Sequence, residues 1–531
     1  MENVEGSHVP VQAGSAAAAV AGLKNPAPLV AVLAATRSTF TSLVRAQEFG
    51  FCDGIRSFAV TWVCCIHGLL FCAWAGLGKD LVWAWWPVAF LGSGDAGVDV
   101  FLVLSGFLIG GALQKEISRS GSISLGKFLV RRFFRIYPSL VPAVVLSALL
   151  EEGGACPFPK WYMYLMVWNN NLSAHSTECI GHTWSVALEL QLYLATPLLF
   201  ALAAGICWLV PGKRCTIPQC MLTFCAITWA LCVALRARDV LDPSPEWKAA
   251  TYYNTPYRVA PFMAGLAVGI LIAERKLLGL APEPGSRWAS WAYLAVWLIF
   301  LSVFCANPVL FQRAARVPAS VTDLSTFGKL HYAFRPPLLG VGVAVLIFLC
   351  AEGLAPTTSR FLGKPAWRVV AGLSYSIYLL QFWGMKFLFV ESYLHAITKP
   401  LLGAPLWLQC LGVYSVVVLF ILAAFPIAFL NYALVERPGI FAGRYCLGLF
   451  RGGSGKAKRV PGAGVPAQSA GEGPVVGRVA SAAGTRPCVD LEACADGCSS
   501  SPDADSAGSS ECASSSATSS ASMPGSTKTL Q

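Results

Sequence analysis

Charged residues are scarce in this chain. Only 13% of its 531 residues are Asp, Glu, Lys or Arg, while 55% are hydrophobic, above the ~45 to 50% typical of soluble domains. Such a composition excludes an ordinary soluble globular protein. It predicts an all-α, polytopic protein that lies in membrane lipid.

Several other signals are also missing. The formal charge is +11, yet no basic cluster is interleaved with base-stacking aromatic residues on a soluble module, so we expect no nucleic-acid partner. The 19 cysteines show no paired CxxC spacing, so we expect small core residues and free thiols. Cys64 and Cys65 beside His67 therefore predict no metal site, and we expect no bound metal or cofactor.

The two ends of the chain lack the features of membrane spans. Residues 1–50 are rich in Ala, Gly and Val and show no signal-peptide order, so we expect an unstructured cytosolic arm, with a transit peptide as the alternative. Residues 446–531 are dominated by Gly, Ser, Ala and Pro, which predicts a disordered cytosolic tail. The membrane domain is then expected over residues 51–445.

About ten apolar segments lie between these ends, and we expect each to form one transmembrane helix. Some are shorter than the ~20 residues that a transmembrane helix needs, so the ends given for each segment are approximate. They lie near 56–75, 97–114, 136–150, 184–210, 216–235, 256–273, 288–306, 333–351, 369–390 and 408–435.

Basic residues are unevenly divided between the loops. Ten spans place both termini on one side, which then holds roughly 24 Lys and Arg against roughly 11 opposite, so we expect cytosolic termini. The opposite loop 151–183 carries a glycosylation sequon at Asn171 together with Cys156 and Cys179, as suits an oxidising compartment. An endomembrane or the plasma membrane fits both features.

The stretch from Asp53 to Leu70, DGIRSFAVTWVCCIHGLL, carries Arg56 and His67 in an apolar segment. Eleven residues at ~100° each make about three turns, so both side chains share one helix face, about 16 Å apart. An ionisable group at bilayer depth costs on the order of 3 kcal/mol. The pattern indicates a functional site; the alternative is a histidine satisfied by a neighbouring helix.

Acidic residues also occur at membrane depth. GDAGVDVFLVLSGFLIGG contains Asp99 and Ser105, and Asp99 either caps its helix or pairs with a cation, for which Arg56 or His67 is the natural candidate. In CIGHTWSVALELQLYLATPLL, Ser185 and Glu189 share one helix face. Glu189 is either a functional acid or part of a structural ion pair.

Other polar residues lie near the ends of spans. Trp184 is expected in the aromatic belt beside His182, and Arg258 either snorkels to the surface or pairs with Glu189. The motif LVERPGI is interpreted as a charged helix end at Glu436 and Arg437.

Arg132 and Arg135, in FLVRRFFRIYPSLVPA, share a face at the cytosolic mouth of the third span. They either anchor the helix against lipid headgroups or dock an anionic cofactor, since the arginine fork matches phosphate oxygens. The ninth span, GLSYSIYLLQFWGMK, adds hydroxyl and amide groups that include Tyr375 and Gln381.

Taken together, these motifs resemble the acyltransferase-3 family of integral-membrane O-acyltransferases. The match runs in the family's order over about residues 50 to 440, through DGIRSFAVTWVCCIH, GVDVFLVLSGFLI, RRFFRIYP, HTWSVALELQLYL, LSYSIYLLQF and LVERP. The resemblance implies ten membrane helices, a cytosolic acyl-CoA donor, and transfer of an acyl group, often acetyl, to a hydroxyl of a carbohydrate, lipid or small acceptor.

By motif position, the resemblance makes His67 the catalytic residue and Arg56 its essential partner. Ser105, Glu189 and Tyr193 lie in neighbouring matched motifs. One position departs from the family, whose ninth-span motif commonly ends in His where this chain has Gln381. Glutamine forms hydrogen bonds but cannot act as an acid or base, which questions the role of this position.

The hypothesis that follows is a general-base mechanism. Imidazole titrates near pH ~6.5, so neutral His67 can remove the acceptor's proton, with Asp99 or Glu189 orienting the ring. A covalent acyl group on His67 or Ser105 is the second possibility. The donor's phosphates are assigned to Arg56, Arg131, Arg132 and Arg135, and the acceptor side to His182, Trp184, Tyr193, Arg258, Tyr375 and Gln381.

Two other classes of protein stay open at this point. A transporter or lipid-binding protein uses intramembrane charges without acyl transfer. The second class is a member of the family that has lost its activity and serves as a structural subunit. Gln381 is the feature that suggests it.

Overall fold

A computed structural model describes the membrane domain. It describes residues 49–77, 86–150, 164–166, 168–170, 180–210, 215–241, 251–279, 287–305, 326–388 and 398–452, with the single residues 39, 41, 43 and 396. The sequon at Asn171, the loop residues Cys156 and Cys179, most of the N-terminal arm and the tail beyond residue 452 lie outside the described residues.

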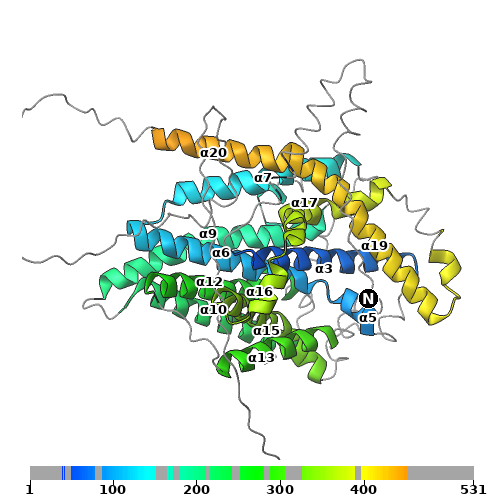
Figure 1. Cartoon of the computed structure of the whole chain (residues 1–531), viewed down its shortest axis with the longest axis horizontal. Helices are drawn as coiled ribbons and strands as arrows, with labels where there is room; N and C mark the ends of the chain where they lie inside the picture. The colour runs from blue at the N-terminus through cyan, green and yellow to red at the C-terminus, as the bar shows by residue number, and fades with distance from the viewer. Residues whose placement is uncertain are drawn as a thin grey trace, which may run out of the picture. The chain divides into compact units, whose positions relative to one another are not determined.

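Ten long helices make up most of the described chain, and each coincides with one of the ten expected apolar segments (Figure 1). Eight of the described helical segments are long and apolar enough to cross a membrane, and the described residues contain no strand. The all-α, multi-pass prediction is therefore confirmed. The ten helices are α3 (Phe51–Trp74), α6 (Ala96–Ser120), α7 (Leu125–Leu150), α9 (Trp184–Leu209), α10 (Ile217–Leu241), α12 (Thr255–Leu277), α13 (Arg287–Cys305), α15 (Thr326–Ala351), α17 (Pro365–Leu388) and α19 (Leu406–Asn431).

Shorter elements join these helices. They are α5 (Trp86–Gly92), the 3-10 turns η3 (Gly181–Thr183) and η5 (Lys399–Leu401), and α16 (Pro356–Leu362). After α19 the chain continues without a break through a π-helical turn, η6 (Tyr432–Glu436), into α20 (Arg437–Gly452). Helical structure therefore runs past residue 445, where the membrane domain was expected to end.

The contact between α6 and α12 depends on glycine. A Cβ atom at Gly265 would lie 2.0 Å from the Val103 carbonyl oxygen, and one at Gly106 would lie 2.2 Å from the Phe262 oxygen. Small residues allow backbones to approach this closely in lipid, where hydrophobic burial does not drive helices together. The glycines of the second span therefore serve helix packing.

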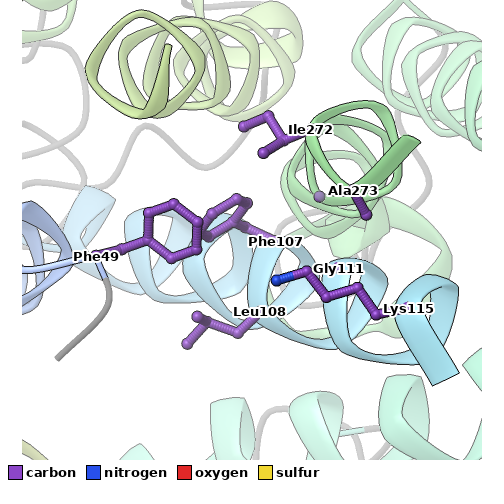
Figure 2. Close-up of a pocket in the computed structure, with 8 residues that line it drawn as sticks. Phe49, Phe107, Leu108, Gly111, Lys115, Ile272 and Ala273 are labelled. Carbon is purple, nitrogen blue, oxygen red and sulfur yellow. The ribbon is translucent and has the colours of Figure 1, made fainter. Parts of the chain in front are cut away.

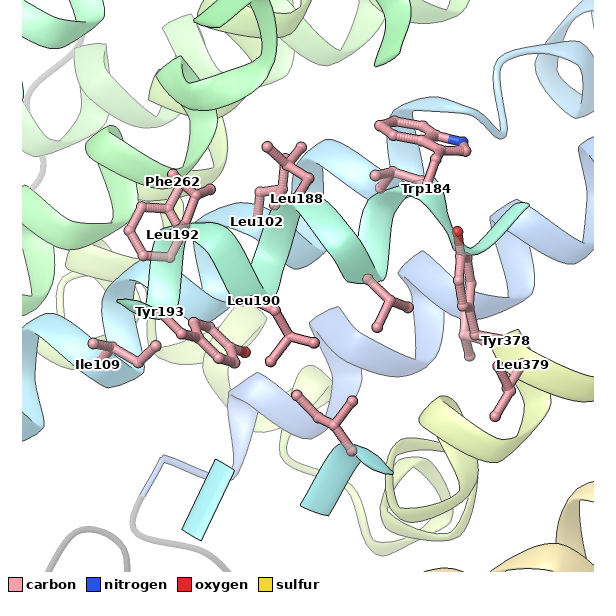
Figure 3. Close-up of a cluster of buried hydrophobic side chains, with 14 of the residues drawn as sticks. Leu102, Ile109, Trp184, Leu188, Leu190, Leu192, Tyr193, Phe262, Tyr378 and Leu379 are labelled. Atoms are coloured by element: carbon pink, nitrogen blue, oxygen red, sulfur yellow. The ribbon is translucent and has the colours of Figure 1, made fainter. Parts of the chain in front are cut away.

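Helix α3 occupies the interior of the described bundle. It packs against α6, α17 and α19, and Figure 3 shows the apolar cluster that α9 forms with residues of its neighbours. Leu188 and Leu192 of α9 meet Leu102 of α6 and Phe262 of α12 there. Polar side chains inside such a core need hydrogen-bond partners within the protein, because no water is available there to hydrogen-bond with them.

Candidate functional site

His67 lies among aromatic rings contributed by two other elements. Its ring centroid is 4.7 Å from that of Phe382 on α17 and 6.3 Å from that of His182 in η3. The Phe382 ring is also 4.9 Å from the ring of His182. The fold therefore brings together two histidines that are far apart in the sequence, and both are half-buried. We call these two residues the histidine pair.

Tyr378 fixes the position of His182. Its hydroxyl donates to the backbone carbonyl of His182 at 2.5 Å and lies 2.6 Å from the Ser185 hydroxyl. The ring nitrogen Nε2 of His182 lies 3.1 Å from the carbonyl oxygen of Leu379. A carbonyl can only accept, so this contact places a proton on Nε2 and leaves Nδ1 as the acceptor of the neutral ring.

Gln381 is the polar neighbour of His67. Its amide nitrogen donates to the Tyr378 carbonyl at 2.9 Å, whereas its Oε1 is buried without a hydrogen-bond partner. Nδ1 of His67 is likewise buried and unpartnered, and the two side chains are adjacent. The position that departs from the family pattern therefore lies directly at the histidine, with an unused acceptor.

A second polar cluster surrounds Glu189. Its carboxylate accepts hydrogen bonds from the hydroxyls of Ser105 and Tyr193. The guanidinium of Arg132 lies over the Tyr193 ring at 5.0 Å and over the Phe128 ring at 5.4 Å. Residues of α6, α7 and α9 thus meet at one acidic group.

Arg56 and Arg135 extend this cluster toward α3 and α17. Arg56 interacts electrostatically with Arg135 and with Tyr193. The Tyr375 hydroxyl donates to the backbone of Ile136 at 3.0 Å, and Tyr375 also lies within the electrostatic reach of Arg135. We call this region the arginine cluster and define it by Arg56, Arg132, Arg135, Glu189 and Tyr193. Tyr375 borders the arginine cluster rather than the region around His182.

Glu436 was interpreted as the charged end of a helix, and this interpretation is wrong. Its side chain is only 1% exposed, accepts from the Ser376 hydroxyl at 2.7 Å, and interacts electrostatically with Arg135 and Arg56. The π-helical turn carries it into the bundle. Its position in a terminal motif gave no sign of this burial.

Arg131 faces away from the arginine cluster. It is exposed, whereas Arg132 and Arg135 are half-buried. Arg131 and Arg135 are four residues apart, about 40° around the helix, so burial and not spacing separates Arg131 from the other two. Of the three, only the latter two face the interior.

Asp99 pairs with Arg258 rather than with Arg56 or His67. A guanidinium nitrogen of Arg258 lies 3.1 Å from its carboxylate, and both side chains are buried. Arg258 also lies 5.3 Å from the ring centroid of Trp184. The ion pair joins α6 to α12, so Arg258 neither snorkels to the surface nor pairs with Glu189. Trp184 is only 6% exposed and is therefore a core residue rather than part of an aromatic belt.

Two further buried arginines were not found by sequence reasoning. Arg335 forms a 2.7 Å ion pair with Asp95, and Arg236 donates at 2.8 to 3.0 Å to four backbone carbonyls, among them those of Tyr332 and Thr251. These contacts connect helices α10, α12 and α15. They give both arginines partners inside the bundle, which favours a structural role.

A small pocket opens at the end of the bundle that holds the start of α3. Phe107, Gly111 and Lys115 of α6 line it, with Phe49 beside Phe107 and Ala273 of α12 across from them (Figure 2). Its wall is apolar apart from Lys115. Neither member of the histidine pair lines it.

Ten long helices with titratable side chains buried between them define a multi-pass membrane protein with a polar interior site. A family model described as an acyltransferase domain (acyltransferase-3) matches residues 49–427. The chain belongs to this family of membrane acyltransferases.

The individual proteins that resemble this chain share a third or less of its residues over the aligned regions. The chain is 24% identical over 406 residues to "Peptidoglycan O-acetyltransferase OatA" of Listeria monocytogenes, covering 73% of this chain and 55% of that protein. It is 33% identical over 122 residues to an uncharacterized protein of Haemophilus influenzae, covering 20% of this chain and 49% of that one. The chain thus spans about half the length of these curated relatives. No solved structure matches it.

Proposed function

We propose that this protein transfers an acyl group from acyl-CoA to a hydroxyl acceptor, with His67 as the general base. The observation that carries the proposal is that Arg56 and His67 extend from one helix, α3, into two separate polar clusters. Eleven residues of helix separate them by about 16 Å. The pantetheine arm of CoA is an extended chain of comparable length.

The arginine cluster suits the phosphates of CoA. Arg132 and Arg135 face the interior from α7, and Arg56 and Arg135 are close enough to repel each other electrostatically. A bound phosphate relieves this repulsion, and the guanidinium fork can form paired hydrogen bonds to its oxygens. Arg131, being exposed, is a weaker candidate for this contact.

The reaction at His67 balances without an added reagent. The imidazole takes the proton of the acceptor hydroxyl, the oxygen attacks the thioester carbonyl, and the carbon–sulfur bond breaks. The CoA thiolate then takes the proton back from the imidazolium. Half-burial of the ring between Phe382 and His182 keeps bulk water from competing with the acceptor.

Gln381 is the residue that we propose to orient His67. A proton on Nδ1 of His67 directed at Oε1 of Gln381 would satisfy both unpartnered atoms and leave Nε2 as the base. The two carboxylates considered for this task are otherwise engaged: Asp99 by Arg258, and Glu189 by Ser105 and Tyr193. Replacement of the family's histidine by glutamine is therefore compatible with activity.

The acceptor is proposed from the surroundings of His182 and from the relatives. The Listeria relative is named for O-acetylation of peptidoglycan, which favours an acetyl donor and a carbohydrate hydroxyl. His182, with Nδ1 as its acceptor atom, lies where it can receive a hydrogen bond from such an acceptor. We place the protein in an endomembrane or the plasma membrane, with both termini on the cytosolic side. The start of α7 is basic and carries part of the arginine cluster, and basic loops lie on the cytosolic side of a membrane.

The test is release of CoA by the purified full chain in detergent or liposomes. Radiolabelled acetyl-CoA is supplied alone, with N-acetylglucosamine oligosaccharides, or with a membrane lipid extract. We expect free CoA and labelled acceptor in equal amounts, and only when an acceptor is present. Label that accumulates inside liposomes without release of CoA would instead indicate transport. Label bound covalently to His67 or Ser105 would indicate an acyl-enzyme intermediate in place of direct transfer.

A further inference from the structure

Three cysteines gather where α9 ends and α10 begins. Cys207 lies in the last turn of α9, Cys215 just before α10, and Cys220 in the first turns of α10. Their sulfur atoms all lie within 4.8 Å of one another. Sequence spacing alone predicted only core residues and free thiols, because C-x7-C-x4-C matches no paired CxxC pattern.

These three differ from the other described cysteines of α10. Cys225 and Cys232 are 3% and 1% exposed and serve as small core residues, as expected from the sequence. Cys207 and Cys215 are only half-buried, and Cys220 is 8% exposed. All five cysteines lie in or pack against one apolar cluster, but such packing does not require the sulfurs of Cys207, Cys215 and Cys220 to converge.

We propose that Cys207, Cys215 and Cys220 bind one thiophilic d10 cation, Zn²⁺ or Cu⁺. Thiolates select these soft ions over Mg²⁺ and Ca²⁺. At a metal–sulfur distance of about 2.3 Å, ligand sulfurs lie roughly 3.8 Å apart in a tetrahedral site and roughly 4.0 Å apart in a trigonal one. The Cys207 and Cys220 sulfurs are 3.8 Å apart.

Cys215 is the ligand that has to adjust. Its sulfur is 2.8 Å from that of Cys220, too close for two ligands of one ion and well beyond the ~2.05 Å of a disulfide. Cys215 precedes α10, so its backbone is not held by that helix, and moving its sulfur about 1 Å away from that of Cys220 brings these two to ligand spacing. Three thiolates satisfy Cu⁺, whereas Zn²⁺ takes a water molecule as its fourth ligand.

The bound ion would connect α9 to α10. Helix α9 also carries Tyr193 and Glu189 of the arginine cluster, about four and five turns before Cys207 respectively. The site would hold the exposed end of α9 in place. Its existence does not depend on the proposed acyl transfer.

The experiment measures metal in the full chain purified in detergent. Cells are grown with added Zn²⁺ or Cu²⁺, metal content is determined by mass spectrometry, and the metal-depleted protein is titrated with Zn²⁺, with Cu⁺ under reducing conditions, and with Co²⁺ as an optical probe. We expect about one ion per chain and a thiolate-to-cobalt absorption band. Cys207→Ser with Cys215→Ser and Cys220→Ser should abolish both, while Cys225→Ala on the same helix should preserve both.

A second readout separates binding from misfolding. Metal removal with a chelator should lower the melting temperature of the parent chain, because a ligand of the folded state stabilises it, and should leave that of the triple variant unchanged. Equal metal content in the triple variant and the parent would overturn the proposal. So would a Cys215–Cys220 disulfide in protein whose thiols were alkylated at lysis.

Discussion

His67 and Gln381 are adjacent side chains, each of which buries one polar atom without a partner. The atoms are Nδ1 of the imidazole and Oε1 of the carboxamide. Because a hydrogen bond between them would fix which imidazole nitrogen is free to act as base, Gln381→Leu should lower kcat about ten- to a hundredfold. KM for acyl-CoA should stay within about twofold, since Gln381 lies away from the arginine cluster.

The matched control at this position is Gln381→Glu, which keeps an acceptor oxygen. It should retain more activity than the leucine variant and shift the pH profile of kcat, because a carboxylate stabilises the imidazolium. A leucine variant with the parent's kcat would remove Gln381 from the proposed mechanism and return it to packing.

The arginine cluster predicts a defect in donor binding. Arg132→Ala with Arg135→Ala should raise KM for acyl-CoA by about 10² to 10⁴, because each of the two lost charge-assisted hydrogen bonds costs roughly 1.5 to 3 kcal/mol. The measurement is initial rate against acyl-CoA concentration. Arg131→Ala, on the exposed face, is the control and should leave KM nearly unchanged. Similar KM values in all three proteins would mean that these arginines serve topology alone.

The pair of Asp99 and Arg258 predicts a stability effect without a direct role in chemistry. Removing one partner leaves a buried charge uncompensated, so Asp99→Ala should destabilise the folded chain by about 3 to 5 kcal/mol. Thermal unfolding in detergent measures the change. Asp99→Asn combined with Arg258→Gln should recover much of the loss. If the single variant melts like the parent, the pair contributes nothing to the α6–α12 contact.

Gly265 predicts a packing defect at that same contact. A Cβ atom there would lie 2.0 Å from the Val103 carbonyl oxygen, so Gly265→Ala forces the two backbones apart. We expect a lower yield of monodisperse protein and a lower melting temperature. Gly126→Ala in α7, where nothing lies within 4 Å of the added Cβ, is the control. A normal elution profile for Gly265→Ala would contradict the close approach.

The positions of the helices could be predicted from the sequence because each depends on one continuous apolar run. The side chains that meet at α3, α9 and α17 come from distant parts of the chain, and no local pattern records which groups become neighbours. Asp99 illustrates this limit: hydropathy indicated that it needs a partner, but only the packing of α6 on α12 identifies Arg258.

Other errors have local physical causes. Glu436 is the last residue of a π-helical turn, which changes the direction of the side chain relative to a regular helix and is not encoded by a simple period. Trp184 lies at the start of its span, as an interfacial tryptophan does, but the Arg258 guanidinium over its ring places it inside the bundle. Helical spacing did indicate that Arg132 and Arg135 share a face, but it also allows Arg131 near Arg135, and only the packing of α7 shows that Arg131 is exposed.

The rate of acyl transfer by His67→Ala tests the central claim most directly. The variant should insert into membranes and elute like the parent, while CoA release with acceptor present falls by about 10² to 10⁴, the usual contribution of a general base. His182→Ala provides the comparison, with a smaller loss concentrated in KM for the acceptor. Transfer by His67→Ala at the parent's rate would contradict the account.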